Sequence, residues 1–114
     1  MTEKTYKVVI SKRAIRDISS MKKYILEQFK YTQLGISFSS KIRKALESLE
    51  VFPFGNISSG LKYREYDIFI KTSRTYMIFY IIDIEKQFVL IVRVLQESMN
   101  WKAIISSWLI DTNN

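Results

Sequence analysis

The sequence contains neither cysteine nor histidine, and these two absences exclude most familiar kinds of catalytic and metal site. Without cysteine, the chain has no disulfide and no thiolate nucleophile. Without histidine, it lacks the side chain that proteins use most often as a general base and as a metal ligand. Any catalysis must therefore use lysine, arginine, tyrosine, serine, threonine or carboxylate groups, and we expect neither a metal nor a cofactor.

Proline and glycine are also scarce, with one proline and three glycines in 114 residues. Long linkers are therefore not expected, and the length favours a single domain over residues 1–114. No uninterrupted apolar run reaches the roughly 18 residues that a membrane span needs. The first residues, MTEKTYKVVISKR, lack the apolar run of a signal peptide. We therefore expect a cytoplasmic protein that does not enter the membrane.

Acidic residues are fewer than basic ones, 11 against 18, so the formal net charge is +7. A small basic domain suggests a polyanionic or acidic partner, although the same excess of charge can simply keep a domain soluble. Hydrophobic residues make up 47% of the chain, which is enough to bury one core and is not a disordered composition.

Apolar periodicity predicts a strand and two helices in the first half of the chain. The run YKVVI at 6–10 has the composition of a strand, and Ser11 can cap the helix that follows. Apolar residues then recur every three or four positions over 12–30 and again over 34–49, with a break at 31–35. Two amphipathic helices joined by a short break indicate an antiparallel hairpin.

A segment rich in helix-breaking residues follows the predicted hairpin. Pro53 disfavours helix at Phe52, and the pair Gly55-Asn56 favours a turn. We expect Phe52 and Phe54 to plug the base of the core, because large aromatic rings in such a position usually pack inward.

The second half of the chain predicts three strands and a short final helix. The strands lie at about 63–71, 76–83 and 88–95, and short polar turns join them as antiparallel hairpins. The spacing of apolar residues over about 100–109 predicts a helix. The fold class is therefore α+β with the order β-α-α-β-β-β-α: an N-terminal strand, a helical hairpin, a three-stranded antiparallel meander and a short C-terminal helix. We expect helices on one face of the sheet, with the C-terminal segment covering the other face only in part and the first meander strand more exposed than the rest.

Basic and aromatic side chains alternate along the predicted strands and turns. Such interleaving can hold phosphates and stack bases, although tyrosine is also common in half-buried strands. Arg93 interrupts the most apolar strand, and alternation places it with Val89, Ile91 and Leu95. A buried arginine must pair, so Arg93 either meets a carboxylate or contacts a phosphate or an acidic partner on the open face. The carboxylates considered are Glu65, Asp67 and Glu97.

Four segments together resemble the RelE/ParE family of type II toxin–antitoxin toxins. YKVVISKRAIRDI resembles the family's opening strand and first helix, and LESLEVFPF resembles the end of its helical hairpin. Lys62-Tyr63-Arg64, followed by YMIFY at 76–80, resembles the second and third strands, and RVLQESMNW resembles the closing strand and tail. The resemblance covers about residues 6–108, and it implies the same α+β fold.

The resemblance implies one of two activities, since RelE-like members cut mRNA on the ribosome and ParE-like members poison DNA gyrase. Both kinds are held inactive by an acidic antitoxin that wraps the toxin. The nuclease branch typically carries an arginine directly after the tyrosine that opens the third strand, where this chain has Met77. It also carries a basic residue or histidine just after the last strand, where this chain has Gln96, and Ser98 stands where relatives often carry arginine. The acid, base and cationic stabiliser that RNA cleavage requires are therefore incomplete.

The sequence thus favours a ParE-like toxin that inhibits an essential target, DNA gyrase, by binding it rather than by catalysis. Its expected partners are that target and a cognate acidic antitoxin, with which it would form a hetero-oligomer. The residues expected at the target or antitoxin surface are Lys62, Arg64, Tyr66, Arg74, Arg93 and Trp101. In the alternative, a ribosome-dependent mRNA endonuclease, Arg64, Lys71 and Arg74 would hold RNA phosphates and stabilise charge. A third hypothesis is a non-toxic basic module that binds RNA or DNA.

Overall fold

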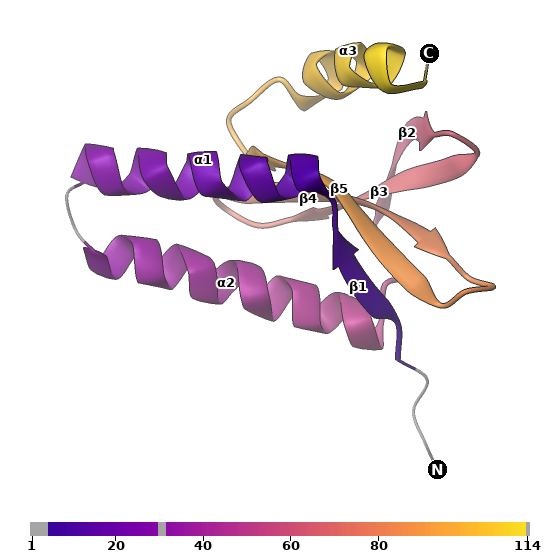
Figure 1. Ribbon diagram of the computed structural model, residues 1–114, viewed down its shortest axis with the longest axis horizontal. Coiled ribbons are helices and arrows are strands. Elements are labelled where there is room, and N and C mark those ends of the chain that lie inside the picture. Colours follow the sequence, from indigo (N-terminus) through magenta and orange to yellow (C-terminus); the bar gives the residue numbers. More distant parts are fainter. Residues whose placement is uncertain (1–4, 30–31, 114) are drawn as a thin grey trace.

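The computed structural model describes residues 5–29 and 32–113, and these residues form three helices and five strands (Figure 1). In chain order the elements are β1 (Lys7–Ile10), α1 (Lys12–Phe29), α2 (Thr32–Val51), β2 (Ile57–Tyr63), β3 (Tyr66–Thr72), β4 (Tyr76–Asp83), β5 (Phe88–Gln96) and α3 (Trp101–Asn113). The predicted α+β class and element order are confirmed, with one strand more in the meander. Within the described ranges, no helix is long and apolar enough to cross a membrane.

The strands lie in the order β1-β5-β4-β3-β2, with β1 parallel to β5 and each remaining pair antiparallel. The additional strand is β2, most of whose residues carry no strand pattern in the sequence. Arg64, with φ of 56°, and Glu65 form the turn after β2, so the strand predicted from residue 63 begins at Tyr66 instead. β2 forms the edge of the sheet, so β3 is an interior strand in the sheet order. Its residues are nevertheless less buried than those of β4 and β5, which confirms the expectation that the first predicted meander strand is the more exposed one.

The helical hairpin covers one face of the sheet. Its apolar stripe packs on side chains from β4 and β5 that point to the same side. The buried members of this cluster are Ala14, Met21, Phe38, Ile42, Ala45, Leu49, Tyr76, Ile78, Tyr80, Val89, Ile91 and Val94. Near the tip of the hairpin the two helices approach so closely that a Cβ at Gly35 would lie 2.8 Å from Cδ2 of Leu26. The helix α2 begins at Thr32, so residues 32–35 are helical rather than part of the predicted break. Residues 30 and 31 lie outside the described ranges.

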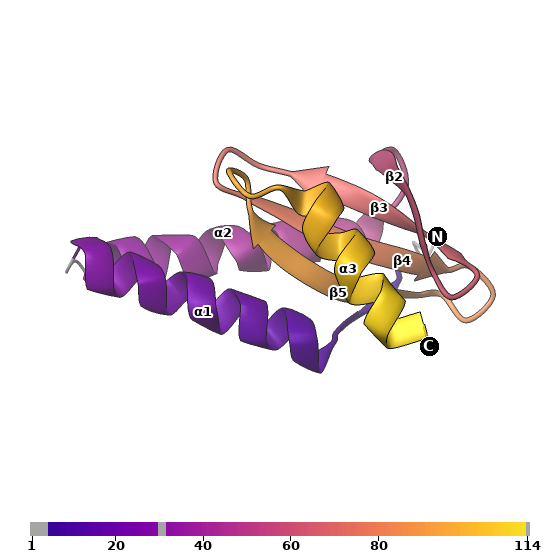
Figure 2. The ribbon, with the colours of Figure 1, turned by 90° about the horizontal axis from the view of Figure 1, so that it is seen from above.

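The C-terminal helix α3 covers the opposite face of the sheet (Figure 2). Ile105 and Leu109 of α3 join a second apolar cluster with Ile68, Met77 and Phe79 of the sheet. The strand β4 is consequently buried on both faces, and every one of its residues except Ile82 is buried. The strand β5 likewise contributes buried residues to both clusters.

The turn after α2 differs from the prediction. Phe52 and Phe54 are 62% and 39% exposed, whereas Pro53 between them is fully buried. The base of the core is filled instead by Tyr80, whose hydroxyl donates a hydrogen bond of 2.7 Å to the Pro53 carbonyl and accepts one of 2.8 Å from Asn56. The phenylalanine rings therefore lie outside the core.

Candidate functional site

The structure separates the predicted binding residues into three places. Lys62, Arg64 and Tyr66 lie around the β2–β3 turn, whereas Arg74 lies in the β3–β4 turn at the other end of the sheet. Because β3 has seven residues, the two turns are about 20 Å apart along that strand. The arginines proposed to hold RNA together in the nuclease hypothesis are thus not brought together.

The remaining predicted residues, Arg93 and Trp101, lie between the sheet and α3. Trp101 packs on the ring of Phe79, with ring centroids 5.7 Å apart. The guanidinium of Arg93 lies over the ring of Trp108, 5.5 Å from its centroid. Both predicted residues therefore help to fix α3 on the sheet.

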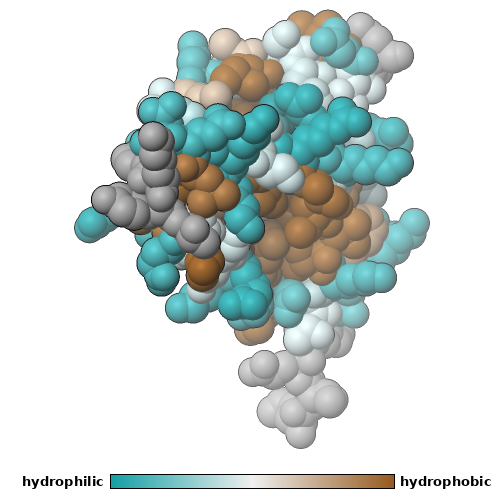
Figure 3. All heavy atoms as spheres, turned by 60° about the vertical axis from the view of Figure 1, so that its left-hand side comes forward, coloured by the Kyte–Doolittle hydropathy of each residue, from teal (hydrophilic) through white to brown (hydrophobic). Residues whose placement is uncertain are grey.

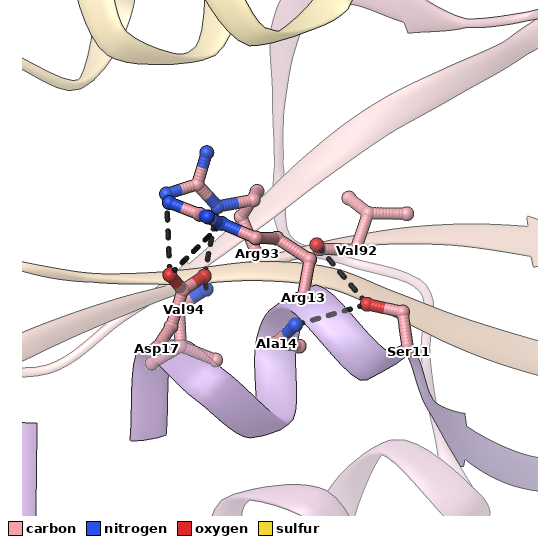
Figure 4. A network of polar contacts seen from close by, with 7 residues as sticks. All are labelled: Ser11, Arg13, Ala14, Asp17, Val92, Arg93 and Val94. Carbon is pink, nitrogen blue, oxygen red and sulfur yellow. Dashed lines mark hydrogen bonds and ion pairs between the residues drawn. The ribbon is translucent and has the colours of Figure 1, made fainter. Parts of the chain in front are cut away.

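Arg93 is buried and forms a two-pronged ion pair with Asp17 of α1 (Figure 4). Its Nε donates to Asp17 Oδ2 at 2.8 Å, and its Nη2 donates to Asp17 Oδ1 at 3.2 Å. A second cation, Arg13, approaches the same carboxylate at 3.5 Å from the more exposed side. The expected partners Glu65, Asp67 and Glu97 are therefore wrong, and the carboxylate comes from a helix that is 76 residues away in sequence.

A bulge in β5 explains how Arg93 reaches α1. Phe79 opposes Arg93, but its neighbour Tyr80 opposes Ile91, so the residue between Ile91 and Arg93 is an extra one. The predicted alternation fails at this point: Ile91 packs toward the helical hairpin, and Leu95 packs toward α3. Because the bulge interrupts the alternation, the side chain of Arg93 points to the seam between α1 and α3, where it contacts Asp17 and Trp108.

The start of α1 also completes the hydrogen bonding of β5 where β1 ends. Ser11 accepts a hydrogen bond of 3.1 Å from the Ala14 N–H, which confirms the predicted cap, and its hydroxyl donates to the Val92 carbonyl at 3.2 Å. Asp17 accepts from the Val94 N–H at 2.9 Å. Asp17 thus accepts hydrogen bonds from both the backbone and a side chain of β5, a role that no sequence motif marks.

The predicted residues around the β2–β3 turn lie in a surface of mixed charge. The guanidinium of Arg64 lies 5.5 Å from the centroid of the Tyr63 ring, which in turn stacks on Trp108. The Tyr66 hydroxyl donates to Asp83 at 3.2 Å, and the negative charge of Asp83 raises the pKa of Tyr66. Tyr66 also lines a hollow with Glu65, Asp67, Asp83 and Glu85. This end of the sheet is therefore not a uniformly basic surface.

The other end of the sheet carries an apolar groove of about 510 Å³ beside the helical hairpin. Its walls are apolar side chains of α1 and α2, and its rim is polar. The walls include Met21, Tyr24, Ile25, Leu34 and Phe38, and the rim includes Lys41, Arg74, Thr75, Gln96, Glu97 and Ser98. The groove brings Arg74 next to Gln96 and Ser98, two of the positions at which the resemblance had located functional differences.

The buried tyrosines of β4, Tyr76 and Tyr80, are not suited to abstract a proton. Burial raises the pKa of Tyr76, and burial likewise raises the pKa of Tyr80. A tyrosine whose pKa lies above 10 keeps its proton at neutral pH, and the Tyr76 hydroxyl is already engaged with the Lys41 carbonyl at 3.2 Å. Neither phenol is therefore suited to act as a general base.

Comparison with known proteins bears on the family and the fold of the chain. A profile of the ParE toxin of the type II toxin–antitoxin system parDE matches residues 8–101. A chain of the toxin–antitoxin complex RelBE2 from Mycobacterium tuberculosis is 21% identical, with a TM-score of 0.59 over 86% of this chain and 98% of that one. A double mutant of the E. coli toxin RelE in the free state is 14% identical, with a TM-score of 0.54 over 95% and 93%. No curated protein matches the sequence. At these identities the solved structures show a common fold and no more. The profile covers most of the chain and therefore identifies its family.

Proposed function

Because the chain belongs to the ParE toxin family of type II toxin–antitoxin systems, we propose that it arrests growth by binding DNA gyrase and that an acidic antitoxin neutralises it. The toxin assignment follows from the family. The choice of gyrase over RNA cleavage depends mainly on one residue, Met77, and on its surroundings.

Met77 occupies the position at which the nuclease branch of the family typically carries an arginine. Here the side chain is only 5% exposed and packs in the apolar cluster beneath α3, with Phe79 and Ile105. An arginine in that place would be surrounded by apolar atoms, so residue 77 serves the packing of the apolar cluster in this chain. Gln96 and Ser98 add no cation and no imidazole at the groove rim. These residues support inhibition by binding over hydrolysis.

One observation favours the alternative, a ribosome-dependent mRNA endonuclease. Lys71 and Arg74, two of the three residues expected to hold RNA, line the same hollow on the α2 side of the sheet. Arg64, the third, lies at the opposite end, and no histidine is present anywhere in the chain. The cationic part of a nuclease site is therefore present without its acid–base part.

The antitoxin surface that we propose is the apolar groove beside the hairpin. Apolar walls with Lys41 and Arg74 on the rim suit an amphipathic segment that carries acidic side chains along its edges. The hairpin side of the molecule also presents an apolar area ringed by hydrophilic side chains (Figure 3). Exposed apolar areas of this kind commonly mark protein-binding surfaces.

Induced expression tests the proposal in cells. We expect growth arrest with relaxed plasmid DNA, and rescue when an acidic reading frame adjacent to the gene is expressed together with the toxin. Mapping of mRNA 5′ ends should show no new cuts in translated messages. Growth that continues unchanged would remove the toxin assignment, and new cuts at ribosomal A sites would replace gyrase with the ribosome.

A matched pair of substitutions on α2 tests the groove. Leu34→Glu places a carboxylate on the groove wall and should weaken rescue by the antitoxin while growth arrest persists. Ile36→Glu changes an exposed residue of the same helix outside the groove and should be rescued as the wild type is. Equal rescue of both variants would show that the antitoxin binds elsewhere.

A further inference from the structure

A second hollow, of about 460 Å³, lies between α2 and the β3–β4 turn. It adjoins the apolar groove and shares Lys41, Arg74 and Thr75 with the groove rim. Four cationic side chains from different elements line it: Lys41, Lys44, Lys71 and Arg74. No carboxylate lines the hollow, and within the described ranges none of the four forms an ion pair. Several positive charges that face one hollow without counter-charges create a strong local attraction for anions.

Hydrogen bonds link the two walls of this basic hollow and close its turn. The Tyr76 hydroxyl at its floor donates to the Lys41 carbonyl at 3.2 Å and so links β4 to α2. The β3–β4 turn is closed by a hydrogen bond from the Ser73 N–H to the Tyr76 carbonyl at 2.9 Å. The hydroxyls of Ser73 and Thr75 lie 3.5 Å apart on the turn. Cations and hydroxyl donors are thus presented from a preformed site, and both groups suit phosphate oxygens.

The shape of the hollow indicates which phosphates it suits. It has no glycine-rich loop, and its one ring, Tyr76, is buried and packs edge-on against Phe38. Without an exposed ring there is no platform on which an unpaired base could stack, as single-strand binding sites usually provide. Cations without such a platform are typical of sequence-independent contact with the backbone of a duplex.

We infer that Lys41, Lys44, Lys71 and Arg74 form a binding site for the phosphodiester backbone of a double-stranded nucleic acid. This site goes beyond the proposed function, because it contacts nucleic acid directly rather than a protein target. The site accounts for the location of four of the basic residues behind the net charge of +7. It also assigns Lys41 and Lys44, which no sequence pattern had singled out.

Fluorescence anisotropy with labelled 20-base-pair DNA and RNA duplexes, and with a single strand of equal length, tests this site. The wild type should bind both duplexes more tightly than the single strand. The double variant Lys41→Gln, Lys44→Gln should bind duplex at least tenfold more weakly at about 0.1 M salt and lower the salt slope by about 1–2. The control, Lys22→Gln with Lys23→Gln, removes two exposed charges from α1 and should stay within about threefold of the wild type.

The outcomes distinguish binding at the basic hollow from binding by the net charge of the whole molecule. Binding of only one of the two duplexes, lost in the Lys41, Lys44 variant, supports the site and names its source. Equal weakening by the two double variants would mean that charge alone holds the duplex, and the site would be rejected. Tighter binding of the single strand, or no binding at all, would also reject it. Circular dichroism melting of each variant checks that these exposed substitutions leave the fold intact.

Discussion

At the scale of single residues, Arg93 is the clearest case in which a partner decides a role. The sequence marked it as an odd cation in an apolar strand, and the structure pairs it with Asp17 and covers it with Trp108. A buried guanidinium held by both carboxylate oxygens ties β5 to α1, and its contact with Trp108 adds α3. We therefore assign Arg93 to the stability of the fold rather than to a target surface.

Removing either partner should be costly. Asp17→Asn leaves the buried guanidinium of Arg93 without its carboxylate, and Arg93→Ala leaves Asp17 only its longer contact with Arg13. For either variant we expect the free energy of unfolding to fall by about 3–5 kcal/mol. Arg16→Ala, at an exposed position on the same helix, should change it by less than about 0.5 kcal/mol. Urea unfolding measures each value, and a loss below about 1 kcal/mol for Arg93→Ala would contradict the structural role.

Tyr80 predicts a dependence of stability on alkaline pH. Burial raises the pKa of Tyr80, so the folded chain retains the phenol proton at a pH where the unfolded chain releases it. This contribution is complete below the unfolded tyrosine pKa of about 10 and is lost as pH rises through the higher folded pKa. The decline of stability above about pH 10 should therefore be shallower in Tyr80→Phe than in the wild type.

The same substitution has a separate cost at neutral pH. It removes the hydroxyl that joins the Pro53 carbonyl and the Asn56 amide, so we expect a loss of about 1–3 kcal/mol. Tyr24→Phe, at an exposed ring, is the control and should match the wild type in both measurements. An alkaline decline that is identical in all three proteins would exclude Tyr80 as its source.

At the scale of elements, local patterns predicted what local physics decides. The two amphipathic helices, the Ser11 cap and the strands rich in apolar residues were all readable from the sequence. The strand β2 was not, because its centre, Ser58-Ser59-Gly60, has low strand propensity, and Gly60 adopts a φ of 80° where the pairing with β3 is irregular. The bulge in β5 was also not readable, since only the pairing with β4 reveals it.

The helix α3 should contribute strongly to stability through its inner face. Ile105 is fully buried among Met77, Phe79 and neighbouring residues, so Ile105→Ala should lower the free energy of unfolding by about 2–5 kcal/mol. Ile110→Ala, at a position of the same helix that is 64% exposed, should change it by less than about 0.5 kcal/mol. Similar values for the two variants would mean that α3 is not docked on the sheet as described.

At the scale of the whole molecule, the charge is distributed in a way that its sum conceals. Four cations surround the basic hollow beside α2, whereas Glu65, Asp67, Asp83 and Glu85 surround the hollow at the opposite turns. The net charge of +7 follows from the composition, but its location does not, because each hollow combines residues from different elements of the chain. For the same reason the apolar groove, built from α1, α2 and the end of β5, could not be anticipated.

The family, by contrast, was within reach of the sequence, because its marks are local segments in a fixed order. The comparison over residues 8–101 confirms that resemblance. The target, in contrast, is recognised by a surface that residues from several elements form together. The burial of Met77 and the absence of histidine favour binding over cleavage, and they leave gyrase as the proposed target.

The most direct test of this proposal is the supercoiling of relaxed plasmid DNA by purified gyrase in the presence of the purified chain. The account predicts that supercoiling falls as the chain is added, that cleaved plasmid accumulates with gyrase and ATP present, and that the chain alone leaves the plasmid unchanged. Supercoiling that proceeds at its normal rate with excess folded chain, and without cleaved plasmid, would contradict the central claim.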